Sequence, residues 1–183
     1  MIFTQTFIPG AYIIDAEPFN DDRGWFARTY CKNEFEKIGH QDEWLQINHS
    51  YTTEKGSIRG MHFQYPPYAE IKTVRCIAGS VYDVIVDLRE SSPTFLKWFG
   101  VELSAENKRT IYIPKGMAHG FQVLEDNSQL IYCHSATYNQ QSEGAILYND
   151  KMVGIVWPLP VANVSNKDKG YNPLDINFKG VKN

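Results

Sequence analysis

The 183-residue sequence is poor in several features that define common classes of protein. Its three cysteines, Cys31, Cys76 and Cys133, lie far apart and form no C-x-x-C pair, which argues against a zinc site and against a disulfide framework. This cysteine usage fits a cytoplasmic protein. The sequence also lacks a long apolar run and a basic N-terminal stretch leading into one, so we expect neither a membrane span nor a secretory signal.

An excess of positive charge is missing as well. The chain has 18 Lys and Arg residues against 21 Asp and Glu residues, for a formal net charge of -3. Because this balance gives no broad basic surface, we expect neither nucleic acid nor an anionic membrane as the main partner. Any anionic ligand must be bound by a local group of cations.

Short apolar and aromatic runs make up most of the chain, separated by Gly, Pro, Asn and Asp. This pattern predicts an all-β protein, and the length fits a single domain over residues 1–183. Many short strands in one domain indicate a sandwich or a closed barrel, with one short helix at residues 32–38. The predicted strands are Ile2 to Phe7, Ala11 to Asp15, Ser57 to Gln64, Thr73 to Ile77, Val81 to Leu88, Lys97 to Leu103, Thr110 to Ile113, Gly120 to Leu124 and Gln129 to His134.

Two segments support more specific expectations. The run SVYDVIVDL, residues 80–88, has one wholly apolar face, whereas Asp83 and Asp87 lie on the other. We expect the apolar face in the core and the other face in water or along a cavity. The tail after Pro158 loses aromatic residues and gains Asn and Lys, so we expect it to wrap the surface or to form a lid.

The segment IPKGMAHGF, residues 113–121, has the form P-x-G-x-x-H and resembles the second conserved motif of the cupin superfamily. In that interpretation Pro114 and Gly116 form the turn into a strand, and His119 points into a barrel. The alternative is that His119, just after the turn, is a structural histidine whose hydrogen bonds are satisfied within the fold.

Metal cupins need three or four converging nitrogen and oxygen ligands, usually two histidines one residue apart with a nearby Glu. Here the corresponding place reads RGMHFQ, with Gln64 where the second histidine would stand. A site built from His62, Glu70 and His119 remains the metal alternative. The residues favour a barrel that works with organic groups alone, without a metal or other cofactor.

Several longer runs carry a more specific resemblance. They are DDRGWF, LQINHS, SIRGMHFQYPPYAEIKTVRCIAGSVYDVIVDLRESSPTF, LSAENKRTIYIPKGMAHGFQVL and YNDKMVGIVWPL, and together they cover nearly the whole chain. In this order they resemble the dTDP-4-dehydrorhamnose 3,5-epimerase family. The resemblance implies an all-β cupin jelly-roll barrel with short peripheral helices, a homodimer, no required cofactor, and epimerisation at C3 and/or C5 of a nucleotide-linked 4-keto-6-deoxy sugar.

Position by position, the resemblance also implies roles for single residues. The base matches His62 with Asp168 as its partner, Lys72 matches the lysine near the keto oxygen, and the proton donor matches Tyr132. Tyr138 matches the aromatic that stacks on the nucleotide base, and it is the alternative proton donor. The other implied substrate contacts are Arg23, Phe26, Arg28, Gln46, Asn48, Arg59, His119, Glu143 and Lys167.

The chemistry accounts for these residue types. A 4-ketone acidifies the hydrogens on C3 and C5, and a histidine with an ordinary pKa of about 6.5 suits their removal near neutrality. A carboxylate fixes the tautomer of that histidine and stabilises its cation. A cation such as Lys72 stabilises charge on the keto oxygen, and an acid on the opposite face completes the inversion. Arginines such as Arg23 and Arg59 suit a diphosphate.

The sequence departs from the family pattern at two places. Arg28 stands where many members carry Glu, so a CDP or GDP sugar is an alternative to the dTDP sugar. The usual A-Q-G-K run reads AEIK, with Glu70 and Ile71 before Lys72. Neither departure distinguishes C3 from C5 chemistry.

Strand geometry raises a conflict within SIRGMHFQ. Strict alternation places Gly60 and His62 on one face of the strand and Arg59 on the other. Arg59 and His62 therefore reach the same pocket only if a bulge interrupts the strand or if two subunits share the site.

Two other functions remain as alternatives. One is a metal-dependent cupin enzyme, such as a dioxygenase or isomerase. The other is a cupin that binds a nucleotide sugar without reacting with it, although the combination of His62, Lys72, Tyr132 and Asp168 favours catalysis.

Overall fold

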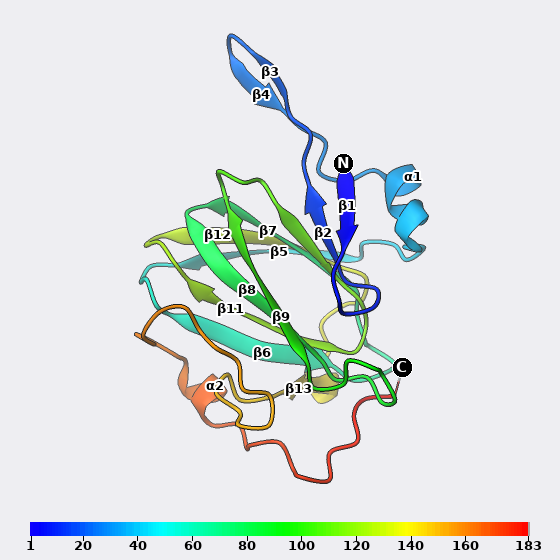
Figure 1. Cartoon of the computed structure of the whole chain (residues 1–183), viewed down its shortest axis with the longest axis vertical. Coiled ribbons are helices and arrows are strands. Elements are labelled where there is room, and N and C mark those ends of the chain that lie inside the picture. The colour runs from blue at the N-terminus through cyan, green and yellow to red at the C-terminus, as the bar shows by residue number, and fades with distance from the viewer. Residues whose placement is uncertain (183) are drawn as a thin grey trace.

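Residues 1–182 are described by a computed structural model in which two antiparallel sheets face each other (Figure 1). The six-stranded sheet has the order β1-β2-β10-β7-β12-β5, and the five-stranded sheet has the order β13-β6-β11-β8-β9. This arrangement confirms the prediction of an all-β cupin jelly roll. The strands are β1 (Ile2–Gln5), β2 (Tyr12–Asp15), β5 (Gln46–Thr52), β6 (Ile58–Gln64), β7 (Lys72–Ala78), β8 (Ser80–Asp87), β9 (Trp98–Ser104), β10 (Thr110–Ile113), β11 (Met117–Val123), β12 (Ser128–His134) and β13 (Glu143–Ala145).

The main core fills the space between the two sheets. Val74 and Leu130 come from the six-stranded sheet, Ile85 and Phe121 come from the five-stranded sheet, and all four are buried. Alternation along β8 places Val81, Asp83 and Ile85 on this inner face. Asp83 is fully buried, so this face of β8 is not in contact with water. The sequence had left open whether this face lies in water or along a cavity, and the first of these alternatives is wrong.

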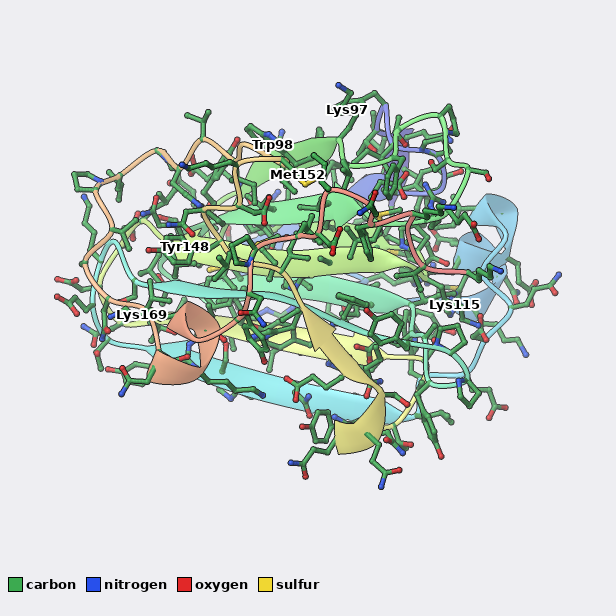
Figure 2. All side chains as sticks on the ribbon, turned by 90° about the horizontal axis from the view of Figure 1, so that it is seen from below. Lys97, Trp98, Lys115, Tyr148, Met152 and Lys169 are labelled. Carbon is green, nitrogen blue, oxygen red and sulfur yellow. The ribbon has the colours of Figure 1, made fainter. Side chains whose placement is uncertain are left out.

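A second core covers the outer face of the five-stranded sheet. Val84 and Val86 of β8, and Leu88 just after it, pack there against Trp157, Phe178 and other residues of the C-terminal segment. Figure 2 shows this segment crossing the sheet near Tyr148, Met152 and Trp98. The tail therefore wraps the surface, as one sequence expectation had it, and it also carries the short helix α2 (Asn166–Lys169).

The predicted helix at residues 32–38 is present as α1 (Lys32–Phe35) followed by the 3-10 helix η1 (Glu36–Ile38). It packs on the outer side of the six-stranded sheet through Phe35, which lies in a third core with Ile14, Ile71 and Tyr112. A second 3-10 helix, η2 (Gln140–Ser142), precedes β13. Within residues 1–182 no helix is long and apolar enough to cross a membrane.

The hairpin of β3 (Phe19–Asp21) and β4 (Gly24–Phe26) extends away from both sheets (Figure 1). All of its strand residues are exposed, with Phe19 at 78% and Phe26 at 74%. The hairpin therefore presents two exposed aromatic rings that no part of the described chain covers.

An irregularity in β6 resolves the conflict between Arg59 and His62. His62 pairs with His119 of β11, and Arg59 pairs with Phe121, so three steps along β6 match two steps along β11. The extra residue is a β-bulge, and it turns Arg59 to the same face as His62. The bulge predicted as one of two solutions is therefore present.

Glycine is required at the bulge. Gly60 has φ of +122°, and a Cβ there would lie 2.6 Å from Gly120 Cα and 2.7 Å from the His119 carbonyl oxygen. The two strands can approach this closely only without a side chain at Gly60.

We predict that Gly60→Ala lowers the free energy of unfolding more than Gly24→Ala does. Gly24 has φ of +132° but no atom within 4 Å of an added Cβ, so this control carries the backbone strain alone. Such strain costs about 1–3 kcal/mol, and the contacts at Gly60 add about 1–3 kcal/mol of overpacking. Urea unfolding of both variants measures the difference, and equal losses would contradict the role of the close approach.

Candidate functional site

A cavity of about 570 Å³ opens between the two sheets. Its size is that of a site for a small organic ligand. The six-stranded sheet contributes side chains from β5, β7 and β12, the five-stranded sheet contributes β6 and β11, and α2 closes one side. The predicted site residues that line it are Asn48, Arg59, His62, Lys72, His119, Tyr132, Lys167 and Asp168.

His62 and Asp168 form a hydrogen-bonded pair although they lie far apart in the sequence. His62 Nε2 is 2.7 Å from Asp168 Oδ1, and Asp168 Oδ2 accepts from the Gly60 backbone N–H at 3.4 Å. Ser165 caps α2 by accepting from the Asp168 N–H at 3.0 Å, which holds the carboxylate in place. His62 is 36% exposed toward the cavity and Asp168 only 5%, so Nδ1 of His62 is the nitrogen left for a ligand.

Lys72 is also held by a carboxylate. Its Nζ is 2.8 Å from Glu70 Oε1, and the second oxygen of Glu70 is 2.8 Å from His134 Nδ1. All three side chains are at most 10% exposed. Burial raises the pKa of Glu70, but the hydrogen bond from His134 and the charge of Lys72 outweigh it and hold the pKa below its ordinary value. This carboxyl is therefore ionised at neutral pH.

Tyr132 and Tyr138 lie in different surroundings. Tyr132 lines the cavity, with its hydroxyl 2.9 Å from Ser50 Oγ, and burial raises its pKa so that the phenol stays protonated. Tyr138 is 56% exposed at the rim, where its hydroxyl donates to Glu143 at 2.9 Å. Tyr132 reaches the cavity from the six-stranded sheet and His62 from the five-stranded sheet, so the two groups approach a ligand from opposite sides.

His119 is the histidine of the P-x-G-x-x-H segment, and it points into the barrel as predicted. Gly116 has φ of +80° in the turn that precedes it. His119 Nε2 is 2.8 Å from Asp83 Oδ2, and the other oxygen of Asp83 is buried without a partner among the described residues. Burial raises the pKa of Asp83, more than the nearby His119 lowers it. This second histidine–carboxylate pair was not predicted as a pair.

Cations outnumber carboxylates in the cavity lining, where Asp168 is the carboxylate, whereas the whole chain has an excess of acidic residues. Arg59, Lys72 and Lys167 all line it. Arg59 is oriented by bonds from Nε to Thr52 Oγ1 at 2.9 Å and from Nη2 to the Tyr51 carbonyl oxygen. A local group of cations of this kind provides what an anionic ligand requires.

The rim joins several further predicted residues in one network. Lys167 Nζ donates to Glu143 at 2.5 Å, beside the Tyr138 hydroxyl. Gln46 accepts from the Tyr138 backbone N–H at 3.0 Å and donates to Asn48 at 3.1 Å. Asn48 and Lys167 reach the cavity, whereas Gln46, Tyr138 and Glu143 border it.

Three predicted contacts do not reach this cavity within the chain. Arg23 is paired with Asp21 at 2.5 Å in the hairpin, and Phe26 is exposed beside it. Arg28 Nη1 is 2.8 Å from Glu34 Oε1, on the side of the molecule that carries α1. The structure of one chain therefore separates these residues from His62.

The residues of the metal alternative have other partners. His62 pairs with Asp168, His119 pairs with Asp83, and Glu70 pairs with Lys72 and His134. Gln64 is buried and bonded to backbone groups of the neighbouring loops. Across residues 1–182 no three His, Cys, Asp or Glu side chains lie close enough to hold a metal ion.

Several residues at the site were not predicted from the sequence. Ser50 and His134 touch Tyr132, and Tyr171 packs its ring edge-on near His62 with 6.2 Å between centroids. Ser50 and His134 follow from alternation once Tyr132 and Asn48 are placed on the inner face. Tyr171 follows from no pattern, because its position depends on the fold of the tail.

Comparison with known proteins gives consistent results. A family model described as dTDP-4-dehydrorhamnose 3,5-epimerase matches residues 5–175. A protein of that name from Shigella flexneri is 47% identical over 176 residues, covering 95% of this chain and 97% of that protein. The match is therefore nearly end to end in both chains.

Solved structures are similar over most of the chain. The dTDP-6-deoxy-D-glucose-3,5-epimerase of Legionella pneumophila Philadelphia 1, in complex with dTDP-4-keto-L-rhamnose, has a TM-score of 0.91 at 38% identity, covering 96% of this chain and 94% of that chain. ChmJ, a 3'-monoepimerase from Streptomyces bikiniensis in complex with dTDP-quinovose, has a TM-score of 0.86 at 29% identity, covering 92% and 85%.

We predict that Asp168 makes stability depend on pH. Burial raises the pKa of Asp168, but the hydrogen bond and charge of His62 outweigh it, so the folded-state pKa lies below the ordinary value. A lowered pKa contributes stability above the unfolded pKa of about 3.9, and this contribution is lost as the pH falls through the folded pKa.

Asp168→Asn should therefore lower the free energy of unfolding by about 1–3 kcal/mol near neutrality. The difference from the parent should shrink below about pH 4. Urea unfolding at a series of pH values measures it, with the exposed Asp22→Asn as the charge-matched control. A difference that stays constant with pH would contradict the paired state of Asp168.

Proposed function

Because the chain belongs to the dTDP-4-dehydrorhamnose 3,5-epimerase family, we propose that it inverts C3 and C5 of a dTDP-linked 4-keto-6-deoxy sugar. The observation that carries this proposal is a single cavity in which a histidine of one sheet, paired with a carboxylate of α2, faces a protonated tyrosine of the other sheet. Lys72 lines the same cavity. Inversion beside a ketone needs these functions in one place.

His62 is the proposed base. Asp168 accepts the hydrogen bond from His62 Nε2, which leaves Nδ1 of His62 to take the proton from the carbon beside the ketone. The same carboxylate stabilises the imidazolium that forms, as in other histidine–aspartate pairs. Arg59 shares the lining because of the bulge at Gly60, so the cation and the base can act on one ligand.

Lys72 is the proposed donor to the keto oxygen. Removing the proton moves the electrons of the C–H bond into an enolate, and the negative charge builds on that oxygen. A buried ammonium held by Glu70 is placed in advance, so little reorganisation accompanies the step.

Tyr132 is the proposed acid. It delivers its proton to the carbon from the face opposite His62, which inverts the centre, and its raised pKa keeps the proton on the hydroxyl until the enolate forms. The exposed Tyr138 is instead proposed to stack on the nucleotide base, and its rim position beside Gln46, Glu143 and Lys167 supports this.

Replacing His62 and Tyr132 should separate the two proton transfers. His62→Asn should lower the exchange of the C3 and C5 hydrogens at least about a hundredfold, because no base breaks the C–H bond. Tyr132→Phe should slow inversion much more than exchange, because His62 can return a deuteron to the face it came from. NMR of a dTDP-4-keto-6-deoxy sugar incubated in D2O reads both quantities.

Tyr138→Phe is the matched control, because it makes the same chemical change, the loss of a phenol hydroxyl, in a tyrosine at the rim. It should raise KM and leave the ratio of inversion to exchange near that of the parent. Exchange without inversion in Tyr138→Phe, with parental inversion in Tyr132→Phe, would make Tyr138 the acid. Deuterium at C3 alone in the parent would make the protein a 3-epimerase.

We further propose that the active form is a cytoplasmic homodimer joined through the outer face of the six-stranded sheet. Ile47, Tyr51 and Ile77 on this face are 67%, 50% and 44% exposed. Next to them a groove of about 230 Å³ is lined mainly by apolar atoms. Exposed apolar side chains of this kind fit a two-fold interface between copies of the chain.

Arg75 supports the same interface. Its side chain lies in the groove, its Nε is buried without an acceptor among residues 1–182, and burial lowers its pKa. A carbonyl or carboxylate from a second copy would supply the acceptor. In such a dimer the projecting hairpin reaches the partner, where Arg23, Phe26 and Arg28 would contact the nucleotide.

We predict that Ile47→Asp separates the dimer, because association would bury a carboxylate in place of an apolar side chain. Analytical ultracentrifugation should give the dimer mass for the parent and the monomer mass for Ile47→Asp, and the monomer should have a raised KM. Ile176→Asp, at an 82% exposed position in the tail, is the control and should remain dimeric. A monomeric parent with full activity would contradict the shared site.

A further inference from the structure

A continuous chain of side-chain hydrogen bonds connects Lys72 with the rim of the cavity. Lys72 Nζ meets Glu70 Oε1 at 2.8 Å, and Glu70 Oε2 meets His134 Nδ1 at 2.8 Å. His134 Nε2 then meets Asn48 Nδ2 at 3.3 Å. The last links are Asn48 Oδ1 with Gln46 Nε2 at 3.1 Å and Gln46 Oε1 with the Tyr138 backbone N–H at 3.0 Å.

The direction of every bond in this chain is set from its rim end. A backbone N–H can only donate, so Gln46 presents its oxygen to Tyr138 and its amide nitrogen to Asn48. Asn48 then accepts with its oxygen and donates with its nitrogen, so His134 Nε2 must be an acceptor. The proton of a neutral His134 therefore lies on Nδ1 and points at Glu70.

At Glu70 this chain meets a second donor, the ammonium of Lys72. The group at position 70 receives two hydrogen bonds, one on each oxygen, and donates none. A carboxylate meets this requirement, whereas an amide offers one acceptor atom and places two donor hydrogens toward the other partner.

We propose that Glu70 is a positioning residue for the epimerase reaction, whose acceptor-only carboxylate fixes both the direction of Lys72 and the tautomer of His134. The role assigned to Lys72 rests on the proposed function. The tautomer of His134 does not, because it follows from the hydrogen bonds alone.

The loop before β7 holds Glu70 firmly enough for this role. Ile71 is buried in the third core, its N–H donates to Ser135 Oγ at 2.8 Å, and its carbonyl oxygen accepts from the Ser135 N–H at 3.0 Å. The two residues that depart from the usual A-Q-G-K run thus act together. Ile71 anchors the backbone, and this anchoring holds the Glu70 side chain in contact with Lys72 and His134.

Glu70 also acts on the second side of the site. The His134 ring that it holds stacks on Tyr132, with 6.1 Å between centroids and 22° between planes. One carboxylate therefore sets the place of the donor to the keto oxygen and supports the ring of the proposed acid. Its loss should affect the rate of the chemical step more than substrate binding, because small displacements of reacting groups reduce rates strongly.

The first test needs no substrate. Long-range proton–nitrogen NMR of histidine-labelled protein at neutral pH distinguishes the two tautomers, and His134→Asn identifies the His134 signals by their loss. We expect the Nδ1–H form in the parent and in Glu70→Asp, and a shift toward the Nε2–H form in Glu70→Gln. A parent with Nε2–H or doubly protonated His134 would overturn the inference.

The second test is kinetic. Glu70→Gln puts back the residue of the usual A-Q-G-K run, and we expect its kcat for inversion to fall at least about tenfold with KM changed less than about threefold. Glu125→Gln, which removes an exposed carboxylate elsewhere, should change neither value nor the His134 signals.

The two readouts together separate the possible failures. An unchanged kcat in Glu70→Gln, or a loss confined to KM, would overturn the positioning role whatever the tautomer does. A tautomer that does not respond to Glu70→Gln would overturn the claim that Glu70 fixes the tautomer of His134. If the parent epimerises no 4-keto sugar, the proposed function fails, while the tautomer of the parent still decides whether Glu70 accepts from His134.

Discussion

The close approach of two strands at Gly60 and Gly120 is the constraint on which the site depends. Only 2.6 Å would separate a Cβ at Gly60 from Gly120 Cα, so the extra residue of the bulge can be placed there only without a side chain. This residue turns Arg59 to the face of His62, and the Gly60 N–H meets the carboxylate of Asp168. One backbone irregularity thus brings together a cation, the proposed base and the carboxylate that is paired with it.

The second general feature of the site is that each buried charged group has a defined partner. Asp168 pairs with His62, Asp83 with His119, and Glu70 with Lys72 and His134. Unpaired charges at such depth would strongly destabilise the fold, so the pairs make a charged site compatible with a β-barrel core. The pairing also fixes orientations, so the proposed base His62 and the proposed acid Tyr132 face the cavity from opposite sheets.

Much of the fold could be predicted because most strands bury one face. β2, β6 to β10 and β12 appear within a residue or two of their predicted bounds, and β11 begins three residues earlier than predicted. β5 was missed because its inner face, with Asn48 and Ser50, lines a polar cavity, while its outer face carries Ile47 and Tyr51. With polar residues facing inward, alternation gives no sign of burial. The hairpin of β3 and β4 was missed because neither face is buried within one chain.

The site could be predicted only in part for a similar reason. His62, Lys72, Tyr132 and Asp168 were named from resemblance, and the structure brings all four to one cavity. Asp168 by itself lies in a polar tail, and its place depends on α2 and on the bridge between Ile58 and Val164. The contacts of Glu70 with Lys72 and His134 could not be predicted, because they need the register of β7 and β12, in which Lys72 lies opposite His134.

The most direct test of the account is the incubation of the parent protein in D2O with dTDP-, CDP- and GDP-linked 4-keto-6-deoxy sugars, followed by NMR. The account predicts deuterium at both C3 and C5 of the dTDP sugar, with inversion at each carbon, and much slower exchange of the other two. Absence of exchange in all three sugars would contradict the central claim that His62 and Tyr132 form an epimerase site.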